Sequence, residues 1–301
     1  MRIHLLGVRG STPAPGPEFT GVGGHTSCVA VSAGTDGAAP PTVVLDAGTG
    51  LQRLGQLLGG APFRGSVLLT HLHWDHTHGL PFWPAGDRAD ARVDVLLPAP
   101  DDGTGECARD VMARAMSPPH FPIGPDGLLG AWRWHGIGPG HHRVEGLDVD
   151  AFEVPHKGGR TFGYRIAEPG AGSVAYVPDH LPRADGPDPT LVARLQGSDV
   201  LLHDAQFTSA EAEVAQRYGH STVDQAIELA RAAGVQRLVL FHHGPTRTDE
   251  EVERIERDAA ALAGADLDVV AARGGMVIET APATVGSWPT SLPTRTSPTA
   301  R

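Results

Sequence analysis

The stretch SVLLTHLHWDH at residues 66–76 joins an apolar run to a dense group of metal-binding side chains. The run SVLLT at 66–70 is typical of a buried strand. The loop that follows holds His71, His73, Asp75 and His76. Imidazole and carboxylate groups are ligands that zinc and manganese accept, and a tight loop can bring them to one point. We therefore interpret this loop as part of a metal site rather than as a polar loop with accidental histidines.

Four side chains are too few to enclose two ions, so further ligands are expected from other strand ends. His156 follows the apolar run LDVDAFEVP, Asp179 follows SVAYVP, and His242 follows RLVLF. Each is the first or second polar residue after a predicted strand. This shared position predicts that all three lie on one edge of a pair of sheets, together with the 71–76 loop.

The runs on either side predict an α/β fold in which two sheets face each other and helices cover the outside, a four-layer αββα sandwich. Strands are predicted at 3–7, 28–32, 42–46, 66–70, 92–98, 147–154, 161–167, 173–177, 199–203 and 237–241. Helices are predicted at 51–58, 106–116, 209–218, 222–234 and 249–264. We expect one domain over residues 1–281 and a disordered Ser/Thr/Pro-rich tail over 282–301. The segment 117–130 is predicted to be a loop that could cover the pocket as a lid.

Composition narrows the class of protein and of substrate. With 40% apolar and 20% charged residues, the chain can bury a sizeable core. A net charge of −11 disfavours a long nucleic acid as substrate, because it offers no broad basic surface for a phosphate backbone. Cys28 and Cys107 form no multi-bridge framework, which suits a reducing compartment. No run has the length of a signal peptide or a membrane span, so we expect a cytoplasmic protein.

The ordered pattern of these ligands resembles that of the metallo-β-lactamase superfamily, His-x-His-x-Asp-His, then His, Asp and His. The similarity covers about residues 1–280 and is closest to the phosphodiesterase branch that includes ribonuclease Z and the phosphoribosyl cyclic phosphodiesterases. The stretches that carry it besides HLHWDH are GVRGSTPAPGP, GGHTSC, LDAGTGL, FGYRI, LLHDAQFT and GHSTVDQA. The resemblance implies the αββα fold, two divalent metal ions and phosphodiester hydrolysis. The imidazole and carboxylate ligands favour zinc first and manganese second.

The resemblance also implies a role for each matching residue. One ion would be held by His71, His73 and His156. The other would be held by Asp75, His76 and His242, with Asp179 as the bridge. Asp75 would also steer the nucleophile. The histidine of the GHST motif, His220, would act near the leaving group, and Asp204 could orient it.

Several other polar residues are interpreted either as supports of the ligands or as residues outside the metal site. Asp46 is a candidate to accept the free N–H of a ligand histidine, which would fix the tautomer of its ring. His243 adjoins His242, but the similarity places the ligand at His242. His180 is interpreted as a pocket-rim residue and His203 as a support behind the ligands. The remaining histidines are placed in a turn (His25) or in solvated loops (His78, His141 and His142).

Four functions remain open. The favoured one is hydrolysis of a small or cyclic phosphodiester, such as a cyclic nucleotide or cyclic ribose phosphate. A tRNA 3′-end endonuclease of ribonuclease Z type is the first alternative, but its bacterial members carry a long tRNA-gripping arm between the third histidine and the bridging aspartate. Here His156 and Asp179 are close in sequence. A thioesterase or lactonase and a non-catalytic metal-binding sensor are the others. A homodimer through 209–234 or 117–130 is left open.

Overall fold

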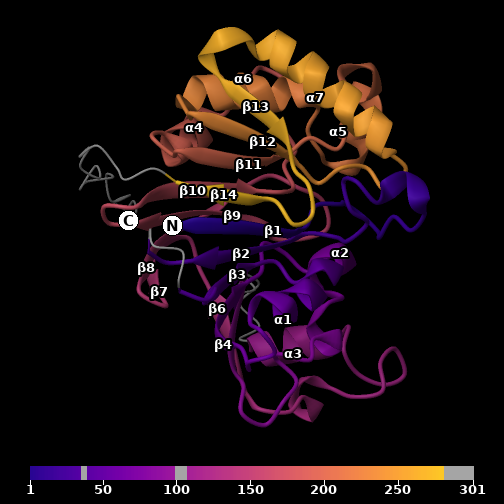
Figure 1. The fold of residues 1–301 in the computed structure, drawn as a ribbon, viewed down its shortest axis with the longest axis vertical. Helices are drawn as coiled ribbons and strands as arrows, with labels where there is room; N and C mark the ends of the chain where they lie inside the picture. Colours follow the sequence, from indigo (N-terminus) through magenta and orange to yellow (C-terminus); the bar gives the residue numbers. More distant parts are fainter. Residues whose placement is uncertain (35–38, 99–106, 281–301) are drawn as a thin grey trace, which may run out of the picture.

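The computed structural model describes residues 1–34, 39–98 and 107–280. Two seven-stranded sheets face each other through the middle of the molecule (Figure 1). The strands of the first sheet, in spatial order, are β14 (Val277–Glu279), β1 (Arg2–Gly7), β2 (Cys28–Ser32), β3 (Val43–Leu45), β4 (Arg64–Leu68), β5 (Arg92–Pro98) and β6 (Ala131–Ile137). Strands β3 to β6 run parallel, so their carboxyl ends share one edge.

The second sheet mirrors this arrangement. Its strands, in spatial order, are β13 (Asp268–Ala271), β12 (Arg237–Phe241), β11 (Val200–Asp204), β10 (Gly172–Val177), β9 (Phe162–Glu168), β8 (Leu147–Glu153) and β7 (Gly140–Val144). Strands β10 to β13 are parallel. Since β9 is antiparallel to both β8 and β10, the carboxyl ends of β8 and β10 lie at the same edge.

Helices form the two outer layers (Figure 1). The first sheet is flanked by α1 (Leu54–Leu57), α2 (Trp74–Thr77) and α3 (Ala108–Ala113). The second sheet is flanked by α4 (Pro189–Leu195), α5 (Ala212–Tyr218), α6 (Val223–Ala233) and α7 (Asp249–Ala263). Capping boxes start the two longest helices, because Thr222 pairs with Gln225 and Thr248 with Glu251.

Three apolar clusters hold the four layers together. The largest lies between the sheets and includes Leu5, Tyr164 and Phe241. A second joins the second sheet to α4, α6 and α7, and a third joins the first sheet to α1 and α3. The architecture is therefore the predicted αββα sandwich. Within the ranges given above, no helix is long and apolar enough to cross a membrane.

Some elements differ from the sequence-based predictions. Strands β6, β7, β13 and β14 and helices α2 and α4 were not predicted. His141 and His142, which were placed in a solvated loop, lie in β7. Strands β6 and β7 are the edges of their sheets and leave much of their surface to solvent, so their sequences lack a continuous apolar run. The predicted tail from 282 onwards lies outside the described residues, as does the end of the predicted domain at 281.

Candidate metal centre

The loop after β4 gathers the first group of polar side chains. It turns at once into the short helix α2, with His73 immediately before the helix. Asp75 and His76 are within the first turn and buried, and His71 is buried just after the strand. The short helix therefore folds the 71–76 segment back on itself, so that its four polar side chains share one small volume.

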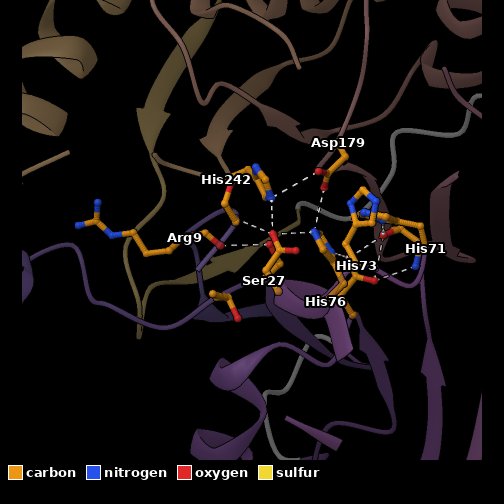
Figure 2. A network of polar contacts seen from close by, with 12 residues as sticks. Arg9, Ser27, His71, His73, His76, Asp179 and His242 are labelled. Carbon is orange, nitrogen blue, oxygen red and sulfur yellow. Dashed lines mark hydrogen bonds and ion pairs between the residues drawn. The ribbon is translucent and has the colours of Figure 1, made fainter. Parts of the chain in front are cut away.

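The second sheet supplies the remaining side chains from three strand ends. His156 follows β8, Asp179 follows β10 and His242 follows β12. In the parallel register of the sheet, Val177 pairs with His203 on β11, and Asp204 pairs with Phe241 on β12. The ends of β10, β11 and β12 are therefore level, which brings the residues after them to one edge. Figure 2 shows Asp179 reaching towards His76 and His242 there.

The structure brings all seven side chains together. Ligand-type atoms of His71, His73 and His156 lie within 4.8 Å of one another, as do those of Asp75, His76 and His242. These are the two sets that the family pattern groups. Asp179 stands between them, because its Oδ2 lies 3.1 Å from Nε2 of His76 and its Oδ1 lies 3.6 Å from Nε2 of His156.

Several atoms at this centre are buried without a hydrogen-bond partner among the described residues. They are Nε2 of His71, Nε2 of His76 and Oδ2 of Asp179; the last two face each other as an ion pair at 3.1 Å but form no hydrogen bond. Leaving such groups unsatisfied costs about 1–3 kcal/mol each, so native proteins rarely do so without a ligand. Nitrogen and oxygen donors with free lone pairs at this spacing suit divalent ions. The residues present therefore fit a metal centre.

A buried network fixes the histidine rings from behind. Nδ1 of His76 donates to Oδ2 of Asp46 at 2.7 Å, and the Asp46 carboxylate also accepts from the Thr70 backbone N–H at 2.7 Å and from the Tyr176 hydroxyl at 3.0 Å. With its Nδ1 bonded to Asp46, the ring of His76 is fixed with Nε2 facing the centre, where a bound ion would replace the Nε2 proton. The supporting position predicted for Asp46 is thus the one that the structure shows.

Two further imidazoles are held in the same way. Nδ1 of His156 donates to the carbonyl of Gly219 at 2.7 Å, and Nδ1 of His242 lies 3.0 Å from Oε1 of Gln206. Neither partner was singled out from the sequence. Both lie in stretches that carry the family resemblance, Gln206 in LLHDAQFT and Gly219 in GHSTVDQA, but a backbone carbonyl such as that of Gly219 leaves no residue-type signal.

Asp75 has partners on both sides of the centre. Its Oδ2 accepts from the backbone N–H of Ser11 at 2.6 Å and lies 3.1 Å from Nε2 of His242. Burial alone raises the pKa of this carboxyl, but the charge of His76 and the contact with His242 outweigh it and hold the pKa well below its usual range. Asp75 is therefore an anion. The contribution of Ser11 was missed, because a backbone donor carries no residue-type signal.

His220 lies beside the centre on the segment between α5 and α6. Its Nδ1 donates to Oδ2 of Asp204 at 2.9 Å, and the same oxygen accepts from the backbone N–H groups of His180 and Ser221 at 3.1 Å each. Burial lowers the pKa of His220, but the adjacent Asp204 carboxylate raises it by more, to about 9. The imidazole of His220 is thus a cation held in a fixed orientation.

Backbone strain is concentrated at this centre. Among the described residues, Ser11, Asp46, Glu145 and His242 are the non-glycine residues with positive φ, and three of these four belong to the network above. Close packing adds to the constraint. A Cβ at Gly10 would collide with the ring of His242, and one at Gly158 would lie 2.7 Å from Nε2 of His73. Strain of this kind persists where the surroundings fix a functional geometry.

The other histidines lie outside the centre. His243 turns away, with Nε2 donating to the Ala272 carbonyl at 3.0 Å. His180 is buried and does not line the pocket described below, so its placement at the pocket rim was wrong. His203 contacts His180 at 3.1 Å and none of the seven clustered side chains directly. His25 lies in a loop beside Thr49, and His78 is exposed at the end of α2.

A pocket of about 550 Å³ opens over the centre. Its walls come from both halves of the chain: Ser11, Leu72, His73, Trp74, Asp75, His156, Asp179, Gln206, Phe207, Val214, Tyr218, His220 and His242. Residues 117–130 are not part of this lining, so the expected lid does not cover the pocket. That loop instead packs beside α3, and its Phe121 contacts Phe82 in the turn at residues 80–82.

Comparison with known sequences identifies related proteins. Residues 42–243 match the family described as the beta-lactamase superfamily domain. Ribonuclease BN of Cronobacter sakazakii is 27% identical over 268 residues, which cover 73% of this chain and 84% of that protein. Ribonuclease Z of Bradyrhizobium diazoefficiens is 28% identical over 271 residues, which cover 71% of this chain and 84% of that protein.

Solved structures share the architecture at lower identity. The metallo-β-lactamase fold protein YhfI from Bacillus subtilis has a TM-score of 0.68 at 17% identity, covering 92% of this chain and 99% of its own. A diphosphatase of the PhnP family has a TM-score of 0.66 at 18% identity, and the match covers 93% of this chain and 98% of that structure. Zn²⁺-bound PqqB from Methylobacterium extorquens has a TM-score of 0.64 at 20% identity, and the match covers 93% of this chain and 100% of that structure.

Proposed function

We propose that this chain, which belongs to the beta-lactamase superfamily and is a hydrolase of the metallo-β-lactamase fold, cleaves a small or cyclic phosphodiester with the help of two divalent ions. One observation carries the proposal. Seven ligand-type side chains converge at one edge of the paired sheets, and the buried His220–Asp204 pair lies next to them. This arrangement combines a site for cations with a separate positive group, which a reaction at a phosphate anion needs.

The proposed ligand sets are built on two of the overlapping His/Asp groups that lie at the centre. One ion would be held by His71, His73 and His156, the other by Asp75, His76 and His242, with Asp179 shared between them. Ions bound there would act as Lewis acids on a phosphoryl oxygen and on the attacking water. Zinc is our first choice because imidazole ligands predominate, and manganese is the alternative.

The protein side chains would complete the reaction. Asp75 is held as an anion by the charge of His76 and the contact with His242, and its Oδ2 accepts from the Ser11 N–H, so it can orient the attacking water. The Asp204 carboxylate raises the pKa of His220 to about 9, and its ring lines the pocket. It can therefore neutralise the charge that develops on the leaving oxygen, or give that oxygen a proton. Asp204 is a positioning residue, because it touches His220 and holds its ring in place.

The size and charge of the site support a small substrate. A pocket of about 550 Å³ lies in the range usual for small-molecule sites. The segment from His156 to Asp179 consists of β9, β10 and the connections around them, so there is no room in it for a tRNA-gripping arm. The excess of 35 acidic over 24 basic residues also gives little attraction for a long phosphate backbone.

Endonuclease cleavage of a tRNA precursor is a second candidate function. The observation in its favour is the sequence similarity to ribonucleases Z and BN, which extends over 84% of the length of both relatives. This activity would require a docking surface for tRNA outside the segment between His156 and Asp179.

A substrate panel tests the two candidates. The metal-loaded protein is assayed with adenosine cyclic monophosphates, a cyclic ribose phosphate and bis(p-nitrophenyl) phosphate, beside a tRNA precursor, a lactone and a thioester. We expect turnover of the small phosphodiesters, which His220→Ala strongly reduces. Efficient cleavage of the tRNA precursor would favour the second candidate, and turnover of the acyl substrates alone would contradict both.

A further inference from the structure

The pocket over the metal centre has an apolar and aromatic rim. Among the described residues, eight large apolar side chains are exposed, and three of them, Trp74, Val214 and Tyr218, line this one pocket. Trp74 is 68% exposed and Tyr218 is 58% exposed. Leaving such side chains in water forgoes the free energy of burying them, so their convergence on one cavity indicates a ligand surface.

The two aromatic residues come from opposite halves of the fold, and each lies within two residues in sequence of a side chain at the centre. Trp74 lies between His73 and Asp75 on α2, which flanks the first sheet. Tyr218 ends α5, two residues before His220, and α5 flanks the second sheet. Phe207 extends this second wall, with its ring centroid 5.9 Å from that of His220. A ligand held between these walls would therefore have its phosphate close to the metal centre.

The indole of Trp74 is held in a defined plane. Its ring stacks on the imidazole of His78, with centroids 5.4 Å apart and an interplanar angle of 15°. One face is thus supported by the protein, whereas the side chain as a whole remains largely exposed and lines the pocket. A supported flat π surface favours a planar ring over a flexible acyl chain.

We propose that Trp74 and Tyr218 form a binding site for a nucleobase, so that the substrate is a nucleotide, such as a nucleoside cyclic monophosphate, and not a sugar phosphate without a base. This inference rests on the proposed phosphodiesterase function. It chooses between the two substrate classes that the metal centre alone leaves open, because the metal ligands and His220 address only the phosphate. The base contributes affinity through stacking, which is tolerant of base identity.

The test compares substrates that differ only in the base. The value of kcat/KM is measured for adenosine cyclic monophosphate and for the corresponding cyclic ribose phosphate, with wild type, Trp74→Leu, Trp74→Phe and Tyr218→Leu. Loss of one stacking partner is expected to lower the ratio of kcat/KM for adenosine cyclic monophosphate to kcat/KM for the cyclic ribose phosphate by about 5- to 100-fold, mainly through a higher KM for the adenosine compound. In Trp74→Phe, which keeps an aromatic ring, this ratio should stay close to that of the wild type. Phe82→Leu is the matched control, because Phe82 is exposed but does not line the pocket.

A binding measurement separates this inference from the proposed function. Calorimetric titration of each metal-loaded protein with adenosine monophosphate and with ribose 5-phosphate requires no turnover. We expect the wild type to bind the adenosine compound more tightly and Trp74→Leu, at unchanged metal content, to lose this preference. Equal affinities in the wild type, or equal losses for both compounds in the variants, would overturn the nucleobase site. An absence of turnover with intact preference for adenosine monophosphate would instead contradict the phosphodiesterase function alone.

Discussion

Nδ1 of His220 lies 2.9 Å from Oδ2 of Asp204, and both side chains are buried beside the cluster of ligand-type residues. The carboxylate orients the imidazole and raises its pKa to about 9 despite the opposing effect of burial. His220 is therefore a fixed positive charge next to the centre rather than a surface residue near a helix end.

The first prediction concerns the separation of metal binding from rate. His220→Ala should lower kcat for a small phosphodiester by about 10²- to 10⁴-fold, because it removes the charge and proton offered to the leaving oxygen. Metal content, measured by elemental analysis, should remain at the wild-type level. Asp204→Asn should give a smaller loss of kcat, since the ring remains but is less well held. A His220→Ala protein with wild-type kcat would show that His220 is not part of the machinery.

The second prediction concerns the support of His76. Asp46→Asn weakens the acceptor that holds the Nδ1 proton of His76, although it keeps the size of the side chain. We expect metal affinity, measured by competition with a chelating dye, to fall by about 10- to 100-fold. Tyr176→Phe removes only one donor to Asp46 and should have a milder effect. An unchanged affinity in Asp46→Asn would mean that the centre does not depend on this carboxylate.

The third prediction concerns a buried cation behind His242. Arg9 is fully buried and donates to the carbonyls of Gly23, Gly244 and Arg247 at 2.8, 3.2 and 2.6 Å. Arg9→Met leaves these acceptors unpaired, so the free energy of unfolding in urea should fall by about 3 kcal/mol.

Because Arg9 fixes the segment after His242, metal affinity should also decrease in Arg9→Met. Arg237→Met, which breaks only an exposed ion pair with Asp268, is the control and should cost less than about 1 kcal/mol. Equal costs for the two variants would argue against a structural role for Arg9.

The fourth prediction concerns the attachment of α7 to β13. Burial raises the pKa of Glu256, but its bonds from Arg273 and from the Ala271 N–H outweigh this and lower the pKa below its usual value. A carboxylate whose pKa is lowered in the folded state stabilises the protein at pH values above its pKa in the unfolded state, which is near 4.5. This stabilisation is lost as the pH falls through the pKa of the folded state.

Glu256→Gln should therefore cost about 1 kcal/mol of unfolding free energy at pH 7. The difference from wild type should shrink as the pH is lowered below 4.5. Urea unfolding at a series of pH values measures this, and a difference that is constant with pH would contradict the assigned contacts.

The sequence predicted the parts of the structure that have a local signal. The strand ending before His71, and the apolar runs before Asp179 and His242, are buried on both faces, so their composition reveals both the strand and its end. Strands β6 and β7 were not predicted, because edge strands tolerate polar residues such as those of GHHRV at 140–144. Helix α4 did carry a signal, since Asp188 precedes a proline at the first helical position.

The supporting contacts of the centre were harder to predict. Asp46 could be proposed because a carboxylate at a strand end is a common partner for a histidine. The donors from Ser11 N–H to Asp75 and from Tyr176 to Asp46 join segments 64 and 130 residues apart, and no local pattern records such pairings. The aromatic rim formed by Trp74 and Tyr218 likewise exists only once the two sheets are packed together.

The central claim is that distant strand ends assemble one centre for two divalent ions. Elemental analysis of the protein after dialysis against zinc or manganese tests it most directly, with His73→Ala and the surface variant His135→Ala alongside. The account predicts about two ions per chain in wild type and His135→Ala, and loss of metal in His73→Ala. A His73→Ala protein with the same metal content as wild type, or a wild type that binds no metal, would contradict it.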